Sequence, residues 1–91
     1  MSVKVRVPSQ LRTLSGGASE VAVEGTTVAG VLAALDASHP GFRDRLFDEA
    51  GKLRRFVNVF LADEDVRFLQ GLDTAVTDGQ TLSIVPAVAG G

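Results

Sequence analysis

The chain has 91 residues, a formal net charge of −2 at pH 7 and no cysteine. A chain of this length forms one small domain, and its 45% hydrophobic residues are enough for a folded core. Nine basic residues among eleven acidic ones exclude a strongly basic, nucleic-acid-binding surface, and the missing cysteine excludes disulfides, thiolate metal sites and thiol nucleophiles.

Two short strands are predicted near the N-terminus. Residues 3–7 and 20–24 alternate apolar and polar side chains, which is the period of a strand with one buried face. The connection 9–19 carries a Gly16-Gly17 pair that is typical of a turn. Two strands joined in this way indicate an antiparallel pair. The core side of this pair is predicted to hold Val3, Val5, Val7, Val21 and Val23.

A helix is predicted next in the chain. Thr27 can cap it, because its hydroxyl can accept a hydrogen bond from an otherwise unpaired N–H of the first turn. Apolar side chains then follow at helical spacing, at Val28, Val31, Leu32 and Leu35. Pro40-Gly41 ends this helix, and residues 42–50 predict one or two irregular turns.

The second half of the chain predicts three more strands. Residues 56–61 are rich in β-branched and aromatic side chains, which favour strands. Residues 62–65 are typical of a turn, and residues 66–68 predict a short strand that pairs with the preceding one. After the turn dipeptide Asp78-Gly79, residues 81–85 predict the last strand.

The predicted order of elements is β-β-α-β-β-β. One main helix packed on one face of a mixed sheet of four to five strands is an α+β two-layer domain. We place this domain at residues 1–85 and a flexible C-terminal tail, ending in Gly-Gly, at residues 86–91. The chain has no run of 18 apolar residues and no apolar block typical of a signal peptide. We therefore expect a cytoplasmic protein without a membrane span.

The tail is the segment that indicates a function. Most chain ends are frayed and carry none. Here two glycines, Gly90 and Gly91, occupy the last two positions, and a backbone without Cβ atoms can enter a narrow channel. The terminal carboxylate is ionised at neutral pH, so it can attack the α-phosphate of ATP to form a reactive acyl-adenylate.

These features resemble the ubiquitin-like sulfur carriers of the ThiS/MoaD family, which have the β-grasp fold. The resemblance rests on the strand order, on the helix that opens at Thr27-Val28, and on Asp78-Gly79, Ile84-Val85-Pro86 and Gly90-Gly91 near the end. Within the family, the CysO-type branch of cysteine-biosynthesis carriers is the most similar. That similarity lies in residues 55–60, 63–68 and 85–91.

The resemblance implies a carrier that catalyses nothing itself and binds no permanent cofactor. An E1-like adenylyltransferase and sulfurtransferase would use ATP to adenylate Gly91 and convert its carboxylate to a thiocarboxylate. A pyridoxal-phosphate-dependent cysteine synthase, or another sulfur-accepting synthase, would take the sulfur, and a zinc metallopeptidase would release the product. The tail residues that would enter a partner's active site are Ala87, Val88, Ala89 and Gly90.

Two other functions share this activation chemistry and stay open. One is the small subunit of a molybdopterin-synthase-like complex, in which the same tail works inside a permanent assembly. The other is a ubiquitin-like modifier, which forms isopeptide bonds with lysines of other proteins. Neither composition nor spacing separates these two from a shuttling carrier.

Phe60, Phe68 and Arg67 are candidate docking residues for partners, because exposed apolar patches on small domains mark interaction sites. The alternative is that the phenylalanines belong to the core and that Arg67 is simply solvated. Residues 63–65 are acidic, which is typical of a solvated turn, and His39, the single histidine, precedes a proline at a helix end. We therefore predict no metal site, no bound nucleic acid and no membrane contact.

Overall fold

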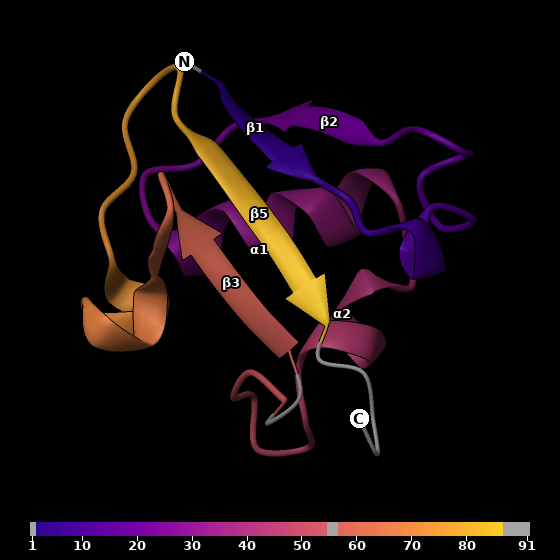
Figure 1. The fold of residues 1–91 in the computed structure, drawn as a ribbon. Helices are drawn as coiled ribbons and strands as arrows, with labels where there is room; N and C mark the ends of the chain where they lie inside the picture. The colour runs from indigo at the N-terminus through magenta and orange to yellow at the C-terminus, as the bar shows by residue number, and fades with distance from the viewer. Residues whose placement is uncertain (1, 55–56, 87–91) are drawn as a thin grey trace.

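The computed structural model describes residues 2–54 and 57–86. Figure 1 shows a twisted sheet with one main helix, α1, on one of its faces. The strands and helices are β1 (Val3–Arg6), β2 (Glu20–Val23), α1 (Val28–Ser38), α2 (Phe42–Leu46), β3 (Val57–Leu61), β4 (Glu64–Asp65) and β5 (Thr81–Pro86). Three 3-10 turns complete the elements: η1 (Ser9–Leu11), η2 (Val66–Phe68) and η3 (Gly71–Asp73).

The sheet has five strands in the order β2-β1-β5-β3-β4. β5, the last strand in sequence, therefore lies in the middle. It runs parallel to β1, with Val5 opposite Leu82, and antiparallel to β3, with Val59 opposite Ile84. The predicted α+β fold, a mixed sheet with one main helix on one face, is confirmed.

The core lies between the inner face of the sheet and α1. Alternate residues of β1, β3 and β5 are buried, as the period of two requires. Of the five valines predicted for the core side, four are buried and Val21 is half-buried at the margin. The helical layer contributes Val28, Val31, Leu32, Leu35, Phe42 and Leu46.

Side-chain caps set the ends of the helices. The predicted cap of α1 is confirmed, since Thr27 Oγ1 accepts a hydrogen bond from the N–H of Gly30 at 3.1 Å. At the other end, Asp36 Oδ1 accepts from the N–H groups of Gly41 (3.2 Å) and Arg43 (2.9 Å). This carboxylate fixes the turn that leads directly into α2. No helix of the described residues is long and apolar enough to cross a membrane.

The predicted strand at residues 66–68 is wrong, because these residues form the 3-10 turn η2. The hairpin after β3 is tighter than expected, with only Ala62 and Asp63 at positive φ (50° and 76°), so pairing resumes already at residues 64–65. The carboxylate of Asp65 then accepts from the N–H of Arg67 at 2.9 Å. This local hydrogen bond turns the chain out of the sheet.

The last strand runs one residue further than predicted. Pro86, which we had placed in the tail, is the last residue of β5 and lies opposite Val57. Phe56, predicted to begin β3, lies outside the described residues. So does the rest of the tail, residues 87–91.

Two glycines, Gly25 before α1 and Gly30 within it, give a matched pair of substitutions. A Cβ on Gly25 would meet the backbone N of Val31 at 2.7 Å, whereas the nearest atoms to a Cβ on Gly30 would be Thr27 Oγ1 at 3.4 Å and Gly25 Cα at 3.9 Å. We expect Gly25→Ala to lower the free energy of unfolding by about 1–3 kcal/mol, because the helix must move. Gly30→Ala, inside the helix, should raise it by roughly 0.5–1 kcal/mol. Urea denaturation measures both; equal effects of the two substitutions would contradict this packing.

Candidate functional site

The strand that leads to the tail, β5, is paired on both of its edges. β5 is paired with β1 and β3, and its inward side chains, Leu82 and Ile84, are buried. The ladder with β3 continues to the end of the strand, where Val85 lies opposite Asn58 and Pro86 lies opposite Val57. Whatever residues 87–91 do, they start from a point that the sheet fixes.

The tail residues Ala87, Val88, Ala89, Gly90 and Gly91 lie outside the described residues. Their proposed reactions therefore remain predictions. The structure does describe the surface that surrounds the start of the tail. This surface is the outer face of the sheet, on the side away from α1.

Outward side chains of β3 and β5 form this surface. Phe60, one of the predicted docking residues, is half-buried there and lies opposite Ser83 on β5 and Asp65 on β4. Val85 is 44% exposed, directly before the end of β5. The sequence analysis missed Val85 as a surface residue, although the alternation of buried Leu82 and Ile84 places it on the outer face.

A shallow hollow of about 320 Å³ borders the same face. It is lined by residues of β5 and of the end of β1 and the segment after it, including Arg6, Pro8, Ser83 and Val85. Arg6 lies opposite Ser83 in the parallel ladder, and its Nε is 3.9 Å from Glu20 Oε2 in an exposed ion pair. A positive charge beside an apolar side chain, next to the base of the tail, is suited to contact a partner protein.

Arg67, the second predicted docking residue, makes contacts within the chain. Its guanidinium donates to Asn58 Oδ1 (2.8 Å) and to the carbonyl oxygens of Arg54 (2.9 Å) and Val57 (2.8 Å). β4 pairs with β3 only at Phe60 and Leu61. β4 does not extend along Val57 and Asn58, so Arg67 supplies the hydrogen bonds to the start of β3 instead. This is the part of β3 that pairs with the end of β5.

Phe68, the third predicted docking residue, lies on η2 and is 86% exposed. A side chain this exposed is not part of the core, so the alternative that Phe68 is a core residue is wrong. The structure thus places Phe60 and Arg67 close to the base of the tail and puts Phe68 on the turn beside them. Contact of these residues with a partner remains a prediction.

The acidic turn offers no metal centre in the described part of the chain. Within residues 2–54 and 57–86, no group of three or more His, Asp or Glu side chains could hold a metal ion. Asp65 caps η2 through the N–H of Arg67, as described above. His39 ends α1, where its N–H donates to the carbonyl of Leu35 at 2.8 Å.

The role of Arg67 can be tested by removing its charge. Arg67→Met should lower the free energy of unfolding by about 1–2 kcal/mol, because three acceptors lose a charged donor that is itself exposed. Arg45→Met is the matched control, since Arg45 is also exposed and no hydrogen bond of its guanidinium is seen among the described residues. Urea denaturation of both variants measures the difference, and equal stability of the two would contradict the role given to Arg67.

The sequence is similar to known carriers and modifiers. The sulfur carrier protein CysO of Mycobacterium tuberculosis is 47% identical over 93 residues, which cover 100% of this chain and 100% of CysO. The small archaeal modifier protein 3 of Haloferax volcanii is 40% identical over 65 residues, which cover 71% of this chain and 70% of the modifier.

The fold and the family model agree with this similarity. A chain from the crystal structure of the Amycolatopsis orientalis BexX/CysO complex is 48% identical, with a TM-score of 0.92 over 98% of this chain and 99% of that one. The model of the ThiS family matches residues 5–91, a range that includes α1, all strands from the middle of β1 onward and the diglycine end. The chain therefore belongs to the ThiS family.

Proposed function

We propose that this chain is a sulfur carrier that delivers sulfur from the carboxyl group of Gly91. The observation that carries the proposal is the position of β5, which is paired with β1 as far as Ser83 and with β3 as far as Pro86, only five residues before the diglycine end. A reactive terminus can enter another protein's active site if its starting point is fixed, as Pro86 is here, and if its last residues have no side chains, as Gly90 and Gly91 have none. The 47% identity to a sulfur carrier over the whole chain supports the same function.

The chemistry uses only the terminus of this chain. A carboxylate oxygen of Gly91 attacks the α-phosphate of ATP and displaces pyrophosphate, which gives the acyl-adenylate. A sulfur nucleophile then attacks the acyl carbon and AMP leaves, so that one carboxylate oxygen is replaced by sulfur. Because the chain has no cysteine, it holds no side-chain thiol that competes for the acyl group.

The partners that we propose are those that the resemblance to CysO-type carriers implies. An E1-like adenylyltransferase and sulfurtransferase would load the carrier, and a pyridoxal-phosphate-dependent cysteine synthase would accept the sulfur. A zinc metallopeptidase would act afterwards, to cut the product from the glycine. The docking surface that we propose for them is the outer face around Phe60 and Val85, with Phe68 and Arg67 at its edge, because it adjoins the base of the tail.

One other function has an observation in its favour. The similarity to small archaeal modifier protein 3 supports a protein modifier, in which a lysine amine rather than sulfur attacks the activated Gly91. The two functions differ in their products. A carrier ends as a free thiocarboxylate, whereas a modifier ends in an isopeptide bond.

The slender end of the tail gives a first prediction. Gly90→Val should lower the rate of thiocarboxylate formation roughly 100-fold or more, because a branched side chain displaces the reacting carbon in a narrow channel. Ala87→Val, three residues earlier, is the control and should change the rate little. The measurement is the intact mass of the chain after incubation with its adenylyltransferase, ATP and a sulfide source. Equal rates for both variants would contradict the proposal.

The docking surface gives a second prediction. Val85→Asp should raise the KM of the carrier for its activating enzyme about tenfold, which is about 1.4 kcal/mol. The control is Ala22→Asp, an equally drastic change at an exposed position of β2, across the sheet from the tail. Steady-state kinetics of adenylation measures both, and circular dichroism checks the fold. If Ala22→Asp weakens binding as much as Val85→Asp does, the surface is elsewhere.

A further inference from the structure

The last two residues of β5 are held by β3 alone. β1 pairs with β5 only as far as Ser83, whereas β3 continues along Val85 and Pro86. Their partners are Asn58 and Val57, at the start of β3. The place where the tail begins therefore depends on how firmly the start of β3 is held.

The start of β3 is held by a side chain and not by a neighbouring strand. β4 is two residues long, and it pairs with the other end of β3. Beside Asn58 and Val57 lies the guanidinium of Arg67, whose Nη1 donates to Asn58 Oδ1 and whose Nη2 donates to the carbonyl of Val57, both at 2.8 Å. Nη2 also donates to the carbonyl of Arg54 at 2.9 Å, just before the strand.

These contacts fix which residues of the ladder bond to β5. The N–H of Val57 donates to the carbonyl of Arg54 at 2.9 Å, and its own carbonyl accepts from Arg67. Both polar backbone groups of Val57 are therefore used on the side away from β5. Because hydrogen-bonded and non-hydrogen-bonded pairs alternate in an antiparallel ladder, the pair that bonds across to β5 is Asn58 with Val85.

The backbone of Arg67 is itself held in place. Val66, the residue before it, is fully buried, and Asp65 Oδ1 accepts from the N–H of Arg67 at 2.9 Å. Two different nitrogens of one planar guanidinium donate to groups on β3 and before it. A lysine ammonium has a single nitrogen and cannot occupy both positions at once.

We propose that Arg67 is a positioning residue for the tail: it holds Val57 and Asn58 in the sheet and so keeps Val85 and Pro86 paired. Without its guanidinium the last two pairs open, and the ladder with β3 ends at Ile84. The chain beyond the ladder then grows from five residues (87–91) to seven (85–91). The two added residues must lose their backbone freedom each time the carboxylate enters a partner's active site. This effect on the reaction rests on the proposed function, whereas the pairing is a property of the free chain.

The first test is native-state hydrogen exchange of the free chain. Arg67→Met should speed exchange at the amides of Asn58 and Val85 about tenfold or more relative to those of Phe60 and Ser83, the next hydrogen-bonded pair of the ladder. If all four rates rise by the same factor, Arg67 stabilises the whole domain and does not position the end of β5, which overturns the inference.

Thr27→Ala is the matched control for overall stability. It removes the cap of α1, which lowers stability by an amount similar to that expected for Arg67→Met, in the layer away from the outer face of the sheet. It should raise the exchange rates of both pairs alike. A preferential effect on Asn58 and Val85 in this variant would also overturn the inference.

The second test is the rate of adenylation by the activating enzyme. Arg67→Met should raise the KM of the carrier about tenfold with little change in kcat, because the terminus is harder to order but reacts normally once bound. Arg67→Lys keeps the charge and should behave like Arg67→Met, and Thr27→Ala should keep the native KM. A native KM for Arg67→Met or for Arg67→Lys contradicts the inference. If the native chain is not adenylated at all, the proposed function fails, and hydrogen exchange still decides whether Arg67 holds the end of β5.

Discussion

The pairing of the last strand on both of its edges is the constraint on which the rest of this structure depends. β5 lies between β1 and β3, and its inward residues Leu82 and Ile84 are buried in the core. If β5 were to unpair, the sheet would separate into the pairs β2-β1 and β3-β4. The sheet therefore fixes the position of Pro86, the residue from which the tail begins.

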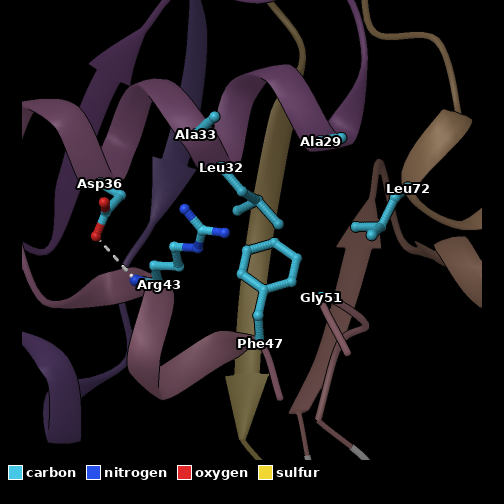
Figure 2. Close-up of a pocket in the computed structure, with 8 residues that line it drawn as sticks. All are labelled: Ala29, Leu32, Ala33, Asp36, Arg43, Phe47, Gly51 and Leu72. Carbon is cyan, nitrogen blue, oxygen red and sulfur yellow. Dashed lines mark hydrogen bonds between the residues drawn. The ribbon is translucent and has the colours of Figure 1, made fainter. Parts of the chain in front are cut away.

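The surroundings of this strand divide into two faces with different chemistry. The outer face carries Phe60 and Val85 beside the base of the tail, and Arg67 keeps the neighbouring part of β3 in place through three hydrogen bonds. The helical side carries a pocket between α1, α2 and η3, bordered by Arg43 (Figure 2). In our account the outer face meets partner enzymes.

Local patterns predicted most of the fold. The alternation in β1, β2 and β5 and the cap at Thr27 depend only on neighbouring residues, so the sequence reveals them. The strand predicted at residues 66–68 is wrong because the side chain of Asp65 accepts a hydrogen bond from the N–H of Arg67, which a strand would use for pairing. The alternation of apolar and polar residues carries no information about this side-chain hydrogen bond. Contacts between distant segments, such as Arg67 with Arg54 and Val57, have no local signal at all. The pocket between α1, α2 and η3 has no local signal either, since segments distant in sequence line it together.

The central claim is that sulfur is carried at the carboxyl end and nowhere else. The most direct test is fragmentation of the loaded carrier in a tandem mass spectrometer, which locates the added sulfur. The account predicts the extra mass on fragments that contain Gly91 and none on fragments from residues 2–86. Since the chain has no cysteine and a single methionine, native sulfur cannot confuse the result. Added sulfur on fragments from the folded domain, with Gly91 unmodified, would contradict the account.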